Sequence, residues 1–132
     1  MRFALNHEAY RNYHDVNLGA QTAQASPVEL VLLLTDGLLE ELMRARAHIE
    51  HRRYELKARS LERCVDMLNG LSSALDFDAG GELVENLGRL YDYCAQRLML
   101  AGLKLDPAFV DEVVRLMSTL REGWAGMQAR HA

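Results

Sequence analysis

The stretch that decides the fold is SPVELVLLLTDGLLEELMRARAHIE, residues 26–50. Ser26 can accept hydrogen bonds from the first free amides of a helix, Pro27 fits the first helical position, and Glu29 completes a capping box. Apolar residues then recur at steps of three and four, which is the spacing of one helix face. The stretch therefore predicts a helix from residue 26 to about residue 50.

Helical spacing recurs through the rest of the chain, and no run between Val28 and Gln128 alternates as a strand does. The clearest break is LDFDAGG, residues 75–81, where two glycines can end a helix. Three further helices are expected at residues 55–75, 82–103 and 106–127. Four helices with short connections predict an all-α fold, an antiparallel up-down four-helix bundle over residues 26–128.

The first 25 residues differ from the rest because they mix polar residues with scattered aromatic ones. We expect a mobile N-terminal arm with at most one short helix. Tyr10 and Tyr13 each offer a large apolar ring with a polar tip, which suits an interface. They either anchor the arm to the bundle or dock into a partner, and both hold if the arm covers a groove until a partner displaces it.

The composition is that of a soluble globular protein. The chain has 132 residues, 49% of them apolar, and a net charge of −4. This length predicts one compact domain, and the charge predicts no general attraction to nucleic acid or anionic membranes. The longest run without charged or strongly polar side chains is Leu30–Leu34, too short to insert in a membrane. Cys64 and Cys94 are expected to be reduced core thiols of a cytoplasmic protein, bonded only if their helices face each other.

Catalytic and metal-binding patterns are missing from the sequence. A di-iron bundle requires Glu-x-x-His on two helices, and this spacing does not occur. His48 and His51 could share a helix face, but the arginines around them disfavour a bound cation. We therefore predict that the protein is not an enzyme and has no catalytic residue, metal site or cofactor.

A basic segment interrupts this acidic chain. Arg44 to Arg63 holds seven basic and three acidic residues. One interpretation is a nucleic-acid-binding regulator that uses this corner, and another is a site for an acidic partner. The favoured interpretation is a solvated turn with ion pairs along the helices, since no aromatic residues are interleaved for base stacking.

Apolar residues cover more of the first helix than a surface helix requires. Two stripes lie side by side, one through Val31, Leu34 and Leu38 and one through Val28, Leu32 and Leu39. The helix is either central in the bundle, with more neighbours to touch, or part of a hydrophobic groove for an amphipathic segment of another protein.

Several ordered segments resemble one known family. They are ASPVELV (25–31) with LLTDG (33–37), LD (75–76) with GGE (80–82), NL (86–87), LYDY (90–93) with RL (97–98), and a final helix with Glu112, Val113, Leu116, LRE (120–122) and Trp124. Together they resemble the flagellar secretion chaperone FliS, the flagellin export chaperone family, from about Tyr10 to Trp124. Two positions depart from the family pattern, because Thr35 stands where an aromatic residue is usual and Cys94 stands where methionine is common.

The resemblance implies a helical, cytoplasmic chaperone of bacterial flagellar assembly. Such a protein binds the disordered C-terminal segment of flagellin, blocks premature polymerisation and delivers flagellin to the export gate, so flagellin and an export-gate protein are the implied partners. In the family an N-terminal tyrosine contributes to docking, and Tyr10 matches it best, with Tyr13 as the alternative. Self-association into a homodimer stays open.

We expect the flagellin groove to lie on the first three helices, at outward positions of their apolar stripes. The predicted contact residues are Leu32, Leu39, Leu61, Leu68 and Leu87.

Overall fold

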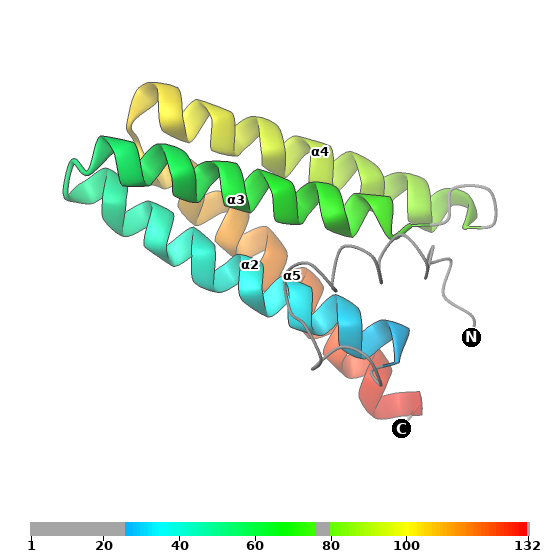
Figure 1. Cartoon of the computed structure of the whole chain (residues 1–132). Coiled ribbons are helices and arrows are strands. Elements are labelled where there is room, and N and C mark those ends of the chain that lie inside the picture. Colours follow the sequence, from blue (N-terminus) through cyan, green and yellow to red (C-terminus); the bar gives the residue numbers. More distant parts are fainter. Residues whose placement is uncertain (1–25, 76–79, 132) are drawn as a thin grey trace.

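Four helices account for most of the chain. The computed structural model describes residues 26–75 and 80–131. Within these ranges the helices are α2 (Pro27–Glu50), α3 (Tyr54–Ser73), α4 (Gly81–Lys104) and α5 (Pro107–His131). Successive helices run in opposite directions (Figure 1), and no strand occurs in the described residues. The all-α, up-down four-helix prediction is confirmed.

The helices contact each other in a ring. α2 packs against α3 and α5, and α4 also packs against α3 and α5, while contacts across the diagonals are much weaker. α4 and α5 contact each other least of the four neighbouring pairs. In Figure 1, α5 lies beside the other helices near the turn that follows α4 and then crosses away, so that its C-terminal half stays with α2.

Local sequence explains where the helices begin and end. The Ser26 hydroxyl accepts a hydrogen bond from the Glu29 amide at 3.2 Å, as the capping box predicts. Gly81 has φ of 60°, a conformation that costs glycine little, at the start of α4. Leu105, the residue after the end of the same helix, also has a positive φ of 54°. This left-handed conformation is less favourable for leucine than for glycine. α5 extends past the expected end at residue 127, since the buried Trp124 anchors its last turns.

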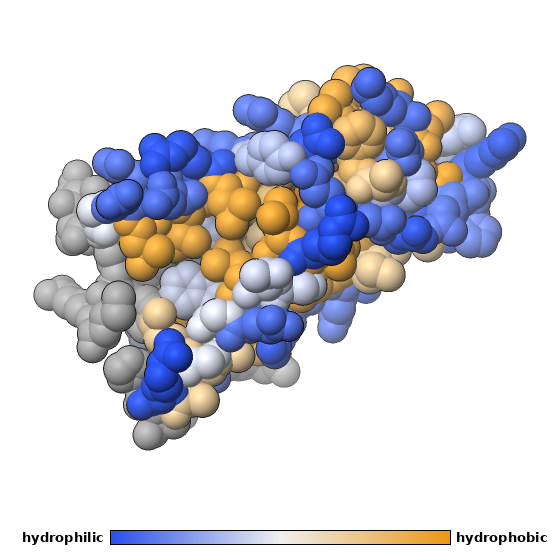
Figure 2. Space-filling view, turned by 180° about the vertical axis from the view of Figure 1, so that it is seen from behind, coloured by the Kyte–Doolittle hydropathy of each residue, from blue (hydrophilic) through white to orange (hydrophobic). Residues whose placement is uncertain are grey.

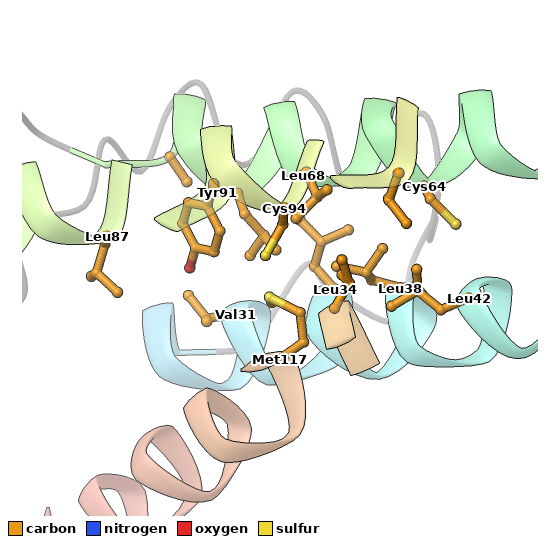
Figure 3. Packing of buried hydrophobic residues seen from close by; sticks show 14 of the residues in the cluster. Val31, Leu34, Leu38, Leu42, Cys64, Leu68, Leu87, Tyr91, Cys94 and Met117 are labelled. Atoms are coloured by element: carbon orange, nitrogen blue, oxygen red, sulfur yellow. The ribbon is translucent and has the colours of Figure 1, made fainter. Parts of the chain in front are cut away.

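The core lies along the bundle axis. Figure 3 shows Leu34, Leu38 and Leu42 of α2 pointing toward Leu68 of α3 and Cys94 of α4. Tyr91 is 2% exposed, its ring extends from α4 toward α2, and its side chain hydrogen-bonds Trp124 of α5. Burial of these side chains stabilises the fold by roughly 1.5–3 kcal/mol each.

Packing against the other helices explains why apolar residues cover so much of the surface of α2. Its N-terminal half is buried at nearly every apolar position, and Met43 is its one strongly exposed large apolar residue. Thr35 is also fully buried, and its hydroxyl has no hydrogen-bond partner in the described structure. The interpretation that α2 touches many neighbours is therefore the one the structure supports.

One buried charge links α2 to α3. Glu41 is 3% exposed, and its carboxylate accepts hydrogen bonds from Arg44 at 2.9 Å, from Arg63 at 3.2 Å and from the Ser60 hydroxyl. Burial by itself raises the pKa of Glu41, but these hydrogen bonds outweigh it and hold the pKa at about 2, against an ordinary 4.5.

Acid should therefore destabilise the bundle through Glu41. Its contribution is complete above its ordinary pKa of 4.5 and disappears as the pH falls through about 2. We predict that the free energy of unfolding, measured with urea, falls by about 3 kcal/mol more in the wild-type protein than in Glu41→Gln between pH 6 and pH 2. Equal pH dependence in the two proteins would contradict this assignment.

Candidate functional site

Two side chains in the C-terminal half of α4 contact α5 and define the edge of α4 that faces it. The Tyr93 hydroxyl donates a hydrogen bond to one carboxylate oxygen of Glu112 at 2.5 Å, and Arg97 donates to the other oxygen at 2.6 Å. The Arg97 guanidinium also lies 4.6 Å from the ring centroid of Phe109. These contacts hold the first turns of α5 against α4.

Beyond these contacts the facing edges of both helices become apolar. Steps of three and four residues place Leu83 and Leu90 on the same edge of α4 as Tyr93 and Arg97. The same steps continue the edge of α5 from Glu112 through three apolar residues. We call the resulting set the α4–α5 surface: Leu83, Leu90, Leu116, Leu120 and Met127.

Solvent reaches this surface because α5 diverges from α4. Figure 3 shows the ribbon of α5 leaving α4 beyond Met117. Leu83 is 48% exposed although it lies on the inward-facing edge of α4, and the other four residues are partly exposed. Figure 2, which views the bundle from behind, shows apolar surface gathered between two polar rims. The α4–α5 surface is therefore an apolar area that the bundle leaves open.

A glycine on the same edge marks how open the surface is. Gly123 follows Leu120 by three residues and precedes Met127 by four. No atom of the described structure lies within 4 Å of the position that a Cβ at Gly123 would occupy. The α5 backbone can therefore be approached closely at this point.

Other exposed apolar residues lie nearer the opposite end of the bundle. Met99 and Leu103 are 66% and 76% exposed, one helical turn apart on α4. Leu105 and Tyr54 are also exposed, in or beside the turns at that end.

The residues predicted for the groove are mostly interior. Leu32, Leu61, Leu68 and Leu87 are 9%, 7%, 1% and 7% exposed, so the outward positions expected for them are corrected, because they pack into the core between neighbouring helices. Leu39 is partly exposed on α2. Whether any of the five contacts a partner stays a prediction. Tyr10 and Tyr13 lie outside the described residues.

The basic segment of residues 44–63 is largely engaged in pairs. Its side chains contact acidic or polar groups along α2 and α3 and on neighbouring helices. The pairs are Arg44 and Arg63 with Glu41, Arg46 with Glu50 and Asp111, Arg53 with His48, Lys57 with the Gly102 carbonyl, and Arg59 with Glu55. Ion pairing within the bundle thus accounts for most of the segment.

Both cysteines are core residues. Cys64 and Cys94 are fully buried and are not bonded to each other. Burial raises the pKa of the Cys64 thiol to about 12 and that of the Cys94 thiol to about 11. Both thiols are therefore protonated at neutral pH and poor nucleophiles.

The described part of the chain contains neither a membrane-spanning helix nor a cluster of metal ligands. None of its helices has the length and apolar character needed to cross a membrane. In residues 26–75 and 80–131, no three side chains among His, Cys, Asp and Glu gather closely enough to hold a metal ion.

Comparison with known proteins identifies the family. The family model of the flagellar protein FliS matches residues 9–131, which is nearly the whole chain. The chain belongs to the FliS family.

FliS relatives are similar over most of their length. The flagellar secretion chaperone FliSB of Pseudomonas aeruginosa is 37% identical over 120 residues, covering 91% of this chain and 95% of the relative. The flagellar secretion chaperone FliS of Salmonella typhimurium is 36% identical over 113 residues, covering 85% and 84% of the two chains. FliS of Bacillus subtilis is 31% identical over 100 residues, with coverage of 76% and 74%.

A solved structure supports the fold independently. The crystal structure of a bacterial flagellar chaperone superposes with a TM-score of 0.76 and covers 95% of this chain and 98% of its own. Its sequence identity is only 16%, so it bears on the fold alone.

The sequence interpretation missed the α4–α5 surface because it placed the groove on the first three helices. Leu116, Leu120 and Met127 lie beside the fully buried Val113 and Met117 rather than among them. The available signal was the width of the apolar arc on α5, which exceeds what one packed neighbour can cover.

A substitution at Gly123 tests whether solvent reaches this part of the α4–α5 surface. We predict that Gly123→Ala raises the free energy of unfolding by about 0.5–1 kcal/mol, since alanine favours a helix and the added methyl group meets open space. Urea denaturation measures this change.

The matched control is Gly102→Ala, also within a helix. A Cβ there would lie 3.2 Å from the Leu61 side chain, so the gain should be smaller or reversed. A loss of stability in Gly123→Ala would mean that the surface is covered.

Proposed function

We propose that this FliS family member is a cytoplasmic export chaperone for flagellin. It binds the disordered C-terminal segment of flagellin, prevents premature polymerisation and delivers flagellin to the flagellar type III export gate. The observation that carries the proposal is the open α4–α5 surface on a bundle of this family. The protein acts by binding, without catalysis or a cofactor.

The α4–α5 surface has the chemistry that such a segment requires. A flagellin terminus that later packs in the filament core must be amphipathic, so its apolar face needs cover while it waits in the cytoplasm. Ordering a disordered chain costs conformational entropy, and a broad apolar contact offsets that cost. The five residues of the surface extend along several turns of both helices, which suits a helix lying in the space between them.

The contact residues named from the sequence belong to this proposal in different ways. Leu39 is partly exposed and can contact flagellin directly on α2. Leu32, Leu61, Leu68 and Leu87 are proposed as contacts only where a bound chain displaces what now covers them. Self-association would cover the same apolar area and is the competing use of the α4–α5 surface.

Binding should depend on apolar side chains of the α4–α5 surface. We predict that isothermal calorimetry detects micromolar or tighter binding of a flagellin C-terminal peptide, and that Leu83→Gln with Leu120→Gln weakens it at least about tenfold. Loss of buried apolar contact is the physical reason.

The control is Leu103→Gln, which replaces a leucine that is 76% exposed and lies outside the surface. It should leave the affinity unchanged. Absence of any binding by the wild-type protein would refute the flagellin proposal, whereas equal affinity of all variants would refute only the location. A dimer that dissociates when Leu83 and Leu120 are replaced would instead support self-association.

The N-terminal arm is proposed to dock a partner through Tyr10, with Tyr13 as the alternative. Tyr10→Ala should change the free energy of unfolding by less than about 0.5 kcal/mol, as surface changes usually do. In a complemented bacterial strain it should reduce the amount of flagellin exported, with Tyr13→Ala as the comparison. Normal export by both variants would exclude docking through these tyrosines.

A further inference from the structure

A second set of groups lies on the edge where α2 faces α3. Because the helices contact in a ring, this edge is opposite the α4–α5 surface. The buried carboxylate of Glu41 orients two guanidiniums here, those of Arg44 and Arg63. The side chains of Arg44 and Arg63 are 53% and 52% exposed, whereas that of Glu41 is 4% exposed. The carboxylate therefore lies beneath two cations that face solvent.

A third cation increases the positive charge of this edge. Arg53 donates a hydrogen bond from Nε to Nδ1 of His48 at 3.0 Å. Partial burial, together with the charges of Arg53, Arg63 and Arg44, lowers the pKa of His48, while Glu41 acts in the opposite direction. Two of the three guanidiniums pair with the Glu41 carboxylate, and the third, that of Arg53, contacts His48.

Apolar side chains flank the cations. Leu56 lies four residues before Ser60 and seven before Arg63, on the edge of α3 that faces α2, and it is 43% exposed. Met67 follows Arg63 by four residues on the same edge and is partly buried. Along α3, this edge therefore carries apolar Leu56, then basic Arg63 and then apolar Met67.

We propose that this edge, which we call the α2–α3 edge, binds an acidic amphipathic helical segment of a partner protein. The carboxylates of the segment pair with Arg44, Arg53 and Arg63, and an apolar side chain of the segment packs on Leu56. Since Glu41 already holds two of the guanidiniums in place, less side-chain entropy is lost when they pair with a ligand. Binding here does not depend on what covers the α4–α5 surface.

A protein partner fits the α2–α3 edge better than nucleic acid does. The chain as a whole carries a charge of −4, which repels phosphate backbones at long range. An exposed leucine between arginines has no use in phosphate binding, whereas it is typical of a contact with an amphipathic helix. Tyr54, the exposed aromatic residue nearby in the sequence, pairs with Lys57, which contacts α4 rather than α2.

The test uses the full chain and a fluorescently labelled synthetic peptide, an amphipathic helix with glutamates flanking one leucine stripe. Fluorescence anisotropy should detect binding that weakens as salt rises, because charge pairs at an exposed edge are screened. The same peptide with glutamine in place of glutamate should bind at least about tenfold more weakly. A duplex DNA oligonucleotide is the second probe and should not compete with the peptide.

Two variants locate the binding without disturbing Glu41. Arg53→Gln and Leu56→Gln should each weaken peptide binding at least about threefold. Their matched controls are Arg59→Gln, an exposed arginine paired with Glu55, and Leu103→Gln, a more exposed leucine elsewhere. Neither control should change the affinity, and a saturating flagellin peptide should leave it unchanged as well.

Equal binding of the glutamate and glutamine peptides, or unchanged affinity in Arg53→Gln and Leu56→Gln, would overturn the proposal. Tighter binding of the DNA, with displacement of the peptide, would replace it by nucleic-acid binding. Neither result would bear on flagellin binding, which is proposed for the α4–α5 surface on the opposite side of the bundle and is tested separately by isothermal calorimetry.

Discussion

Two ion pairs tie α5 to α2, one near its start and one in its C-terminal half. Arg46 contacts Asp111 at 2.5 Å, and Arg121 contacts Asp36. To α4, α5 is held through Glu112 and Phe109 in its first turns and through Trp124, which hydrogen-bonds Tyr91. Such partly exposed pairs add little stability, but they specify which neighbour α5 follows. Because α5 packs more closely on α2 than on α4, apolar side chains on the facing edges of α4 and α5 stay partly open.

This arrangement explains how a small bundle can be stable and still offer apolar surface. Buried side chains of all four helices supply the stability, and Val110, Val113 and Met117 keep α5 in that core. Leu116 and Leu120 lie beside these core residues on the surface of α5, so the α4–α5 surface is continuous with the core. A foreign amphipathic chain placed there would extend the core rather than rest on a separate patch.

The sequence predicted the fold because its signals are local. The capping box at Ser26 and the glycines at residues 80–81 mark helix boundaries, and so does Asp106, which accepts a hydrogen bond from the Ala108 amide just before Pro107 begins α5. Apolar spacing marks the faces between these boundaries. These signals do not report the angle at which two helices cross. That angle decides whether a residue such as Leu83 or Leu87 is covered, and it depends on contacts between distant segments.

The same limit explains the errors in the predicted groove. Leu61, Leu68 and Leu87 have the spacing of an edge stripe, yet neighbouring helices close over them. The interpretation of the basic segment as a turn with ion pairs agrees better with the structure. Oppositely charged residues three or four positions apart on one helix can be recognised from sequence. The link from Arg63 to Glu41 joins two helices, so spacing alone could not reveal it.

The most direct test of the account is hydrogen–deuterium exchange of the full chain with and without a flagellin C-terminal segment. Apolar residues left open between α4 and the C-terminal half of α5 predict that slower exchange concentrates in residues 81–93 of α4 and 116–128 of α5. The α2–α3 edge should exchange as before. Protection confined to α2 and α3, with α4 and α5 unchanged, would contradict the account.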